Sequence, residues 1–281
     1  CGITGFRPSV GLIPRRHGFP PLTLDFQAIG VMARSARLVR LATEAMAGPD
    51  VRDRASLAFT GLGAATPGRL RLRLVPGGAE TDPEVAALVR EAAEVLRGLG
   101  HALHEGPMPH DAEGLVAIRS VLSAAGVARI VASHPGWESL VTPPIRIAAE
   151  RGFAVTTAQY IAAMDALTAW RAETAAAMVG VDVLVTPTCP LPAWPLETAV
   201  ARVPGMPAGP AQAVAFTAFA NAMGWPGISL PCGLTRAGLP VGVQLVAPYG
   251  ADRRLLDLAE AFQDATDWHT LRPPTEVSDR P

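Results

Sequence analysis

The sequence contains no lysine, because all 24 basic residues among its 281 are arginines. Schiff bases, P-loops and lysine general bases all need a lysine amine, so none of them can be built from these residues alone. Cysteine is also scarce. Three scattered residues (Cys1, Cys189 and Cys232) are too few for a disulfide framework. We therefore expect a reducing environment and a cytoplasmic location.

Long apolar runs and blocks of one charge are missing as well. The net charge is -1, and no basic block or acidic tail is present, which argues against a nucleic-acid partner. The longest apolar runs, such as VDVLV at 181–185, are far shorter than the roughly 20 residues of a membrane span, so no membrane partner is expected. The length suffices for one large α/β domain or two smaller ones.

Segments typical of strands and helices alternate along the chain. RLRLRLV at 69–75 alternates leucine and arginine, which predicts a strand with one face toward solvent. TDPE at 81–84 offers Thr81 as a helix cap, with Glu84 at capping-box spacing. HALHE at 101–105 then predicts the next strand. This order predicts an α/β fold with helices packed over a sheet.

The same patterns predict the remaining elements. Further helices are expected near 34–47, 111–131, 157–179, 210–223 and 252–265, and strands at 181–186, 227–234 and 240–247. The last two strands are joined by TRAG, with Gly238 in the turn, and predict a hairpin. The proline-rich stretch 186–195 leaves the end of a strand, where α/β proteins tend to place ligand sites.

Metal and serine-hydrolase sites find little support in the sequence. His101 and His104 would point to opposite faces of a strand, and His110 brings no Cys pair or HExxH motif with it. No metal site is expected. A GxSxG elbow is absent, and Ser229 in PGISLPCG is interpreted as a sheet residue. Cys189 and Cys232 are interpreted as packing residues, since free cysteines are usually small buried hydrophobes.

The first three residues raise an alternative. Cys1 followed by Gly-Ile is what a processed N-terminal-nucleophile glutaminase shows, in which the thiolate attacks an amide carbon and the free α-amine is the base. The flanking sequence argues against this alternative, because such enzymes continue into a β-rich sandwich. A third alternative is a truncated or degenerate relative of an enzyme, which binds a ligand without catalysing a reaction.

Two long blocks resemble the amidase signature family of amide hydrolases. In the first block, residues 1–35, the matching positions are Cys1, Gly2, Gly5, Pro8, Gly11, Gly18, Asp25, Gly30 and Met32. The block departs from the family at Arg7, where a lysine is usual, and at Val31, where a proline is usual. In the second, residues 186–256, the matches are Thr217, Asn221, Gly224, Pro226, Ser229, Pro231, Cys232, Gly233, Gly238, Pro240, Gly242 and Gln244. The similarity covers nearly the whole chain, and the middle is loose.

The resemblance implies a mixed β-sheet core covered by helices on both faces, incomplete at the N-terminus. The family uses a Ser–cis-Ser–Lys triad that lies before the block beginning at Cys1. The resemblance therefore implies that residues 1–281 are the C-terminal portion of a single amidase domain, with no catalytic residue in this chain. Cys1 then becomes an internal family position. No cofactor is implied, and a homodimer is left open.

The resemblance also implies where a small carboxamide substrate would bind. The candidates for the substrate pocket are Thr188, Cys189, Thr217, Asn221, Trp225 and Arg146. Arg146 lies roughly where the tRNA-dependent amidotransferase branch has an arginine that grips a substrate carboxylate, a task that suits a guanidinium fork. That branch has an acidic residue where this chain has Val214, so a generic amidase is favoured.

Overall fold

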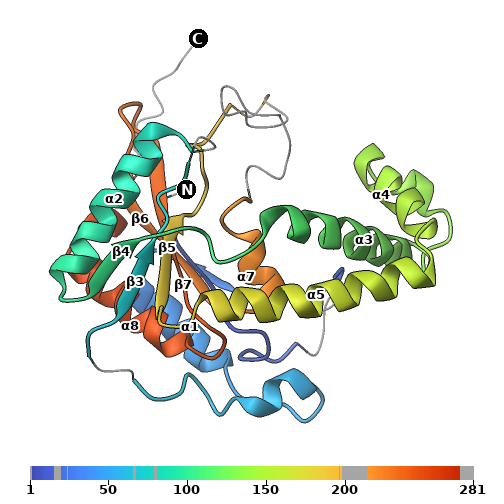
Figure 1. Ribbon diagram of the computed structural model, residues 1–281, viewed down its shortest axis with the longest axis horizontal. Helices are drawn as coiled ribbons and strands as arrows, with labels where there is room; N and C mark the ends of the chain where they lie inside the picture. Colours follow the sequence, from blue (N-terminus) through green and yellow to red (C-terminus); the bar gives the residue numbers. More distant parts are fainter. Residues whose placement is uncertain are drawn as a thin grey trace.

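A seven-stranded sheet runs through the middle of the molecule (Figure 1). The computed structural model describes residues 2–15, 20–23, 25–65, 68–78, 81–195, 197 and 214–272. Its strands are β1 (Thr4–Arg7), β2 (Val31–Ala33), β3 (Arg71–Leu74), β4 (Ala102–Glu105), β5 (Val183–Pro187), β6 (Gly227–Leu234) and β7 (Pro240–Val246). They are ordered β2-β1-β6-β7-β5-β3-β4. The α/β class expected from the sequence is confirmed.

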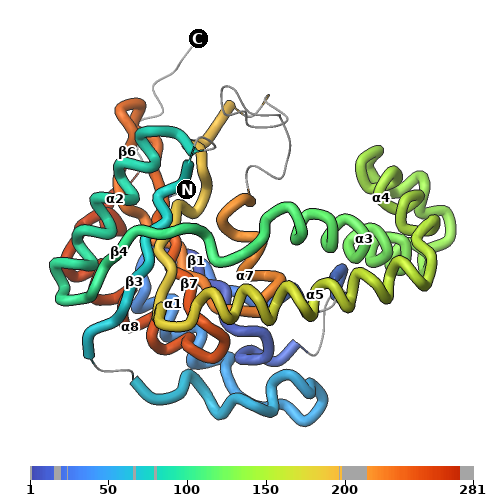
Figure 2. Tube along the Cα trace, in the orientation of Figure 1, coloured from blue at the N-terminus to red at the C-terminus, as the bar shows by residue number. Residues whose placement is uncertain are grey.

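The sheet is mixed, and both ends of the chain contribute to it. Strand β3 runs parallel to β4 and β5, whereas β5, β7, β6, β1 and β2 pair antiparallel in that order. The N-terminal strand β1 lies against β6 from the C-terminal part of the chain (Figure 2). This pairing brings residues more than 200 positions apart into contact.

Alternating side chains explain how β3 sits in the sheet. Leu72 and Leu74 are buried on one face, while Arg71 is exposed on the other and forms an ion pair with Asp182 at 3.1 Å. Alternation with a period of two places successive side chains on opposite faces of a strand. The strand predicted over 69–75 is confirmed.

Three helices cover one face of the sheet (Figure 1). They are α1 (Ala36–Met46), α2 (Pro83–Gly98) and α8 (Asp252–Asp264). Their apolar stripes and the strands share one core, which includes Val39, Leu72, Leu96, Ile228, Val243 and Leu256. Burial of this continuous apolar surface is the main force that holds the helices on the sheet.

Helices α3 (Ala112–Val131), α5 (Thr157–Ala177) and α7 (Ala218–Met223) lie on the opposite face. The second core combines residues of these helices with the strands, including Leu122, Leu167, Leu184, Phe219 and Val246. Helices α3 and α5 run outward from the sheet, and α7 has only six residues (Figure 1). Part of this face is therefore left for a groove.

Most predicted helices and the hairpin are confirmed. The helices near 34–47, 111–131, 157–179 and 252–265 and the hairpin with Gly238 (φ +77°) are present. The helix expected over 210–223 is wrong in length, because α7 begins at Ala218 and a turn occupies 214–217. Positions 210–213 lie outside the described residues.

Helix α2 begins one residue later than the capping-box pattern implied. Its N-cap is Asp82, whose Oδ1 accepts from the backbone N–H groups of Glu84 (2.8 Å) and Val85 (3.4 Å). Thr81 is buried instead, with no hydrogen-bond partner for its Oγ1 within the described part of the chain. A carboxylate caps a helix N-terminus with charge as well as hydrogen bonds.

Helix α4 (Pro143–Phe153) was not anticipated from the sequence. It packs on α3, and only Ala149 and Gly152 are buried. Because so few of its residues are buried, helix α4 shows no helical repeat of apolar residues in the sequence. Together α3, α4 and α5 form a helical arm that extends away from the sheet (Figure 1). We call these three helices the arm.

Helix α3 has the length and hydropathy of a candidate membrane span. An 18-residue window of this 20-residue helix has a mean hydropathy of 1.6, although Arg119 and Arg129 interrupt its apolar runs. The helix packs on α4 and α5, and 39% of its apolar window is buried inside the molecule. The core helices of soluble proteins meet the same criteria of length and composition.

Candidate active-site groove

A row of polar side chains crosses the middle of the sheet on the face that carries α7. Ser229 of β6 stands opposite Gly5 of β1 on one side and opposite Gln244 of β7 on the other. Gln244 in turn stands opposite Thr186 of β5. Directly opposed residues share a face, so the four positions form one row, in which Ser229, Gln244 and Thr186 carry the polar side chains. Polar groups on so buried a surface need defined partners.

Thr188 extends this row into a pair of hydroxyl groups. Its Oγ1 lies 2.6 Å from Ser229 Oγ, and its backbone N–H donates to Gly242 O at 2.9 Å. A Cβ at Gly242 would lie 2.9 Å from Thr188 Oγ1 and 3.0 Å from Ser229 Oγ. The hydroxyl pair therefore lies directly over a glycine, and any side chain there would push the two oxygens apart.

Two cavities flank the hydroxyl pair and share it as a common wall. The first, of about 360 Å³, is lined mainly by apolar groups, among them Leu191, Trp194 and Val241. The second, of about 440 Å³, is more polar in its side chains and includes Thr217, Asn221 and Gln244. Both include Gly5, Met32, Thr188 and Ser229. We call the two cavities together the groove.

Arg7 closes the polar end of the groove. Its guanidinium donates to the backbone oxygens of Trp225 (2.5 Å), Phe26 (3.2 Å) and Pro8 (3.2 Å). Burial lowers the pKa of Arg7 to about 10, and the charges of Asp252 and Asp25 partly oppose this shift. The group stays protonated at neutral pH and ties the end of β1 to the turn before β6.

The structure brings four of the six sequence-derived candidates to the groove. Thr188 and Cys189 follow β5, where the proline-rich loop begins, and both line the apolar cavity. Thr217 lies at the end of the turn before α7, and Asn221 lies on α7. Both residues line the polar cavity. Asn221 is exposed, and its side-chain amide has no hydrogen-bond partner among the described residues.

The other two candidates lie elsewhere. The side chain of Trp225 is 5% exposed and packs in the second core, so only its carbonyl reaches the groove region, through Arg7. Arg146 is exposed on α4, on the arm, where it donates to Glu138 O at 2.6 Å (Figure 1). The tertiary structure therefore does not assemble Arg146 with the other candidates.

The described cysteines are protonated thiols at neutral pH. Burial raises the pKa of Cys189, and burial raises that of Cys232 to about 12. Cys232 is 3% exposed, and its Sγ donates to Val241 O at 3.6 Å. A thiol is a poor nucleophile compared with its thiolate, which agrees with the packing role inferred from the sequence. Cys1 lies outside the described residues.

The histidines considered as metal ligands in the sequence do not converge on a metal site. His101 accepts a hydrogen bond from Leu70 N at 3.2 Å, and His110 stacks on Phe219. Over the described part of the chain, no group of three or more His, Cys, Asp or Glu side chains is arranged to hold a metal ion. The chemistry available in the groove is hydrogen bonding by hydroxyls and amides.

Sequence reasoning missed two residues of the groove. Ser229 was interpreted as a sheet residue, which is correct, but its side chain also lines both cavities. Gln244 matched the family pattern without being assigned to the site. The signal was present, since each is a polar residue at an alternating position within an otherwise apolar strand.

Comparison with known proteins identifies the family of this fold. The family model described as Amidase matches residues 1–256. The chain belongs to the amidase family. Within the described residues, this amidase-family chain has the mixed sheet and helix layers expected of the family, not the two-sheet sandwich that the glutaminase alternative requires.

Individual relatives agree with this assignment. The chain is 29% identical to a glutamyl-tRNA(Gln) amidotransferase subunit of Pseudomonas putida (strain W619), over 96% of this chain and 61% of the relative. The corresponding subunit of Chromohalobacter salexigens is 32% identical, over 97% and 61%. This chain thus spans about three fifths of the length of these relatives.

Solved structures show the same fold. The structure of 6-aminohexanoate cyclic dimer hydrolase superposes with a TM-score of 0.82 at 26% identity, covering 97% of this chain and 62% of that one. A bacterial aryl acylamidase superposes with a TM-score of 0.80 at 20% identity, covering 96% and 59%. At that identity, the second likeness concerns the fold alone.

Proposed function

We propose that this chain forms the substrate-binding wall of an amide hydrolase that cleaves the C–N bond of a small, non-peptide carboxamide. The observation that carries the proposal is the hydroxyl pair of Thr188 and Ser229, which lies beside Gln244 in a groove of an amidase-family sheet. Hydroxyls and a carboxamide side chain match the donors and acceptors of an amide. Apolar groups beside them match its hydrocarbon part.

We infer that the catalytic groups come from outside residues 1–281, which form the C-terminal portion of a single amidase domain. The family's triad requires a lysine, and this chain has none. In that mechanism the lysine accepts a proton through the bridging serine, and the nucleophilic serine attacks the carbonyl carbon. Backbone N–H groups then stabilise the oxyanion.

The lining of the groove favours an uncharged substrate. None of its described lining residues is acidic, and the guanidinium of Arg7 is engaged by backbone carbonyls. Val214 supplies no carboxylate at the position where the amidotransferase branch has an acidic residue. A generic amidase is therefore favoured over an enzyme for a charged amino-acid amide. A homodimer and a cytoplasmic location stay predictions.

The test examines the reading frame upstream of Cys1 and the protein that it encodes together with residues 1–281. The proposal requires a lysine followed by a Gly/Ser-rich stretch there, and the protein made from the longer frame should release ammonia or amine from small amides. A serine-directed fluorophosphonate should abolish that activity, and residues 1–281 alone should show none. Hydrolysis by residues 1–281 alone, or an upstream frame without a lysine, would contradict the proposal.

A further inference from the structure

The side-chain amide of Gln244 is held in one orientation. Its Nε2 donates to Phe216 O at 2.6 Å and to Thr186 Oγ1 at 3.0 Å. A backbone carbonyl can only accept, and Thr186 donates its own hydroxyl proton to Pro187 O at 2.9 Å. Both neighbours of Nε2 are therefore acceptors. The nitrogen is identified by its partners, and the opposite atom must be the carbonyl oxygen Oε1.

Among the described residues, that oxygen has no hydrogen-bond donor in the groove. No described residue donates a hydrogen bond to Gln244 Oε1, although the residue is only 6% exposed and lines the cavity of about 440 Å³. With both N–H groups directed to protein acceptors, Oε1 is the polar atom of this side chain available to the cavity. Gln244 Oε1 is not among the fully buried unpartnered atoms of the described residues, so it remains accessible from the cavity, and a ligand N–H could donate to it.

The neighbouring hydroxyl pair supplies the complementary group. Thr188 and Ser229 share one hydrogen bond at 2.6 Å, which uses one of their two hydroxyl protons. The second proton has no acceptor among the described residues and is free to be donated. Because Ser229 stands directly opposite Gln244 across β6 and β7, a donor and an acceptor lie next to each other in the groove.

We propose that Gln244 and the Thr188–Ser229 pair recognise the amide group itself. The free hydroxyl donates to the amide carbonyl oxygen, while Gln244 Oε1 accepts from the amide N–H. The substrate class is then an amide that retains an N–H, either primary or secondary, rather than a tertiary amide or an ester. This inference rests on the proposed function, since it assigns the atoms that hold the amide in that groove.

The apolar cavity can accept an aromatic ring, which suggests two test ligands, benzamide and acetophenone. Benzamide and acetophenone have the same ring and carbonyl, but acetophenone carries a methyl group where benzamide has its NH₂. Either ring can lie against Leu191, Trp194 and Val241 beside the hydroxyl pair. The two ligands differ in the group that would donate to Gln244 and in the carbonyl acceptor, which is stronger in the amide, so a variant at Gln244 is needed to isolate the contribution of the N–H donor.

Isothermal titration of residues 1–281 with both ligands tests the proposal. Benzamide is expected to bind about tenfold more tightly than acetophenone, because only benzamide supplies a donor to Gln244 Oε1. The variant Gln244→Met should lower benzamide affinity and leave acetophenone affinity unchanged. The double variant Thr188→Val with Ser229→Ala should weaken both ligands about tenfold. The matched control is Ser120→Ala on the exposed side of α3, which should change neither affinity.

The outcomes separate this inference from the function on which it rests. Equal affinities of the unmodified chain for the two ligands would overturn the amide-recognition role and leave amide binding by the groove standing. This comparison needs no variant, so it holds even where Gln244→Met does not fold. Binding of neither ligand at millimolar concentration would overturn both proposals. Loss of acetophenone binding in Gln244→Met to the same extent as benzamide would contradict the assigned role of Oε1.

Discussion

His110 lies between two aromatic side chains at the start of the helical layer. Its ring stacks on Phe219 with centroids 4.9 Å apart and meets the edge of Trp170 at 5.6 Å. Burial lowers the pKa of His110 to about 4, and Asp111 opposes this shift only partly. The imidazole is therefore neutral at pH 7. It acts as a flat packing group that joins the loop after β4 to α5 and α7.

The free energy of unfolding should decrease at acidic pH because of His110. The pKa of His110 in the folded state lies below its ordinary value of 6.5, so between these values the unfolded chain binds more protons. The free energy of unfolding should therefore decrease as the pH falls from 6.5 toward 4. Urea unfolding of the wild type and of His110→Phe at pH 7.5 and pH 5 measures this. The variant should lose less stability over that interval, and equal losses in both proteins would contradict the assignment.

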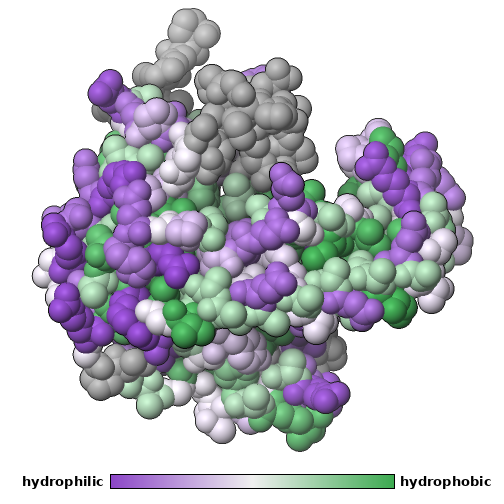
Figure 3. All heavy atoms as spheres, viewed as in Figure 1, coloured by the Kyte–Doolittle hydropathy of each residue, from purple (hydrophilic) through white to green (hydrophobic). Residues whose placement is uncertain are grey.

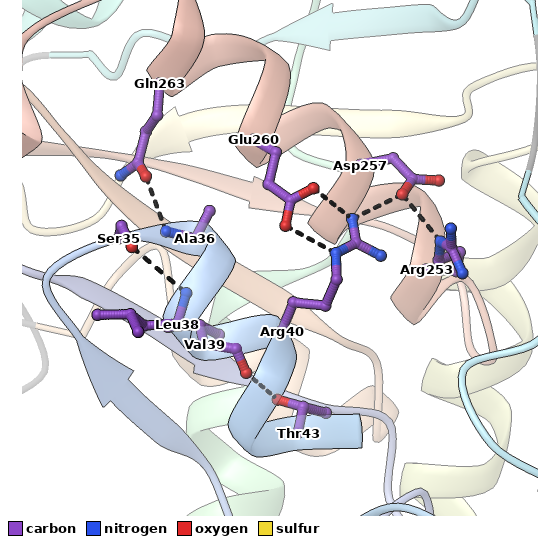
Figure 4. A network of polar contacts seen from close by, with 10 residues as sticks. All are labelled: Ser35, Ala36, Leu38, Val39, Arg40, Thr43, Arg253, Asp257, Glu260 and Gln263. Atoms are coloured by element: carbon purple, nitrogen blue, oxygen red, sulfur yellow. Dashed lines mark hydrogen bonds and ion pairs between the residues drawn. The ribbon is translucent and has the colours of Figure 1, made fainter. Parts of the chain in front are cut away.

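At the scale of elements, α1 and α8 are joined by one charged network (Figure 4). Arg40 of α1 contacts Glu260 at 2.7 Å and Asp257 at 2.6 Å, and Asp257 also accepts from Arg253 at 2.9 Å. Gln263 caps the start of α1 by accepting from Ala36 N at 2.7 Å. The two helices are thus fixed to each other by directional contacts as well as by the shared core.

Replacing Arg40 tests how much this network stabilises the helix pair. The variant Arg40→Met keeps the apolar stem but leaves Glu260 and Asp257 without their shared cation, so the free energy of unfolding should drop by about 2 kcal/mol. Chemical denaturation monitored by circular dichroism measures the change. The control Arg37→Met removes an exposed arginine from the same helix and should stay within about 0.5 kcal/mol of the wild type. Similar effects of the two variants would contradict the role of the network.

At the scale of the whole molecule, the arm and the sheet are stabilised differently. Strands β6 and β7 lie in the middle of the sheet, while α4 packs on α3 at the far end of the arm. The space-filling view shows apolar patches on the outer surface of the arm (Figure 3). Exposed apolar side chains of the arm include Ile147, Phe153 and Ile161. With few buried contacts, α4 should open more readily than the sheet.

The close approach of α3 and α4 gives a test of this difference. A Cβ at Gly152 would lie 2.0 Å from Ala124 O, so Gly152→Ala should force the two helices apart. Hydrogen exchange followed by mass spectrometry should show faster exchange in α4, by about tenfold or more, with β6 and β7 unchanged. The control Gly98→Ala meets no atom within 4 Å and should not alter exchange in the arm. Equal acceleration in the sheet would contradict independent opening of the arm.

Local sequence patterns predicted most of the helices and strands of this fold. Alternation predicted β3, and the hairpin turn with Gly238 predicted the β6–β7 pair. Helix α4 could not be predicted, because a helix that buries only Ala149 and Gly152 has no apolar period. The N-cap of α2 was also misassigned. Thr81 and Asp82 are both good capping residues, and the sequence does not show that Thr81 is buried by tertiary packing.

By itself, the sequence determined the chemistry that this chain can and cannot provide. Without a lysine it cannot complete a lysine-dependent triad, and the motifs of its two ends carried the family resemblance. The tertiary structure decided which residues meet. It placed Thr188, Ser229 and Gln244 together, and it left Arg146 on the arm. The reason is that strand register aligns side chains from segments distant in sequence, and no local pattern records that alignment.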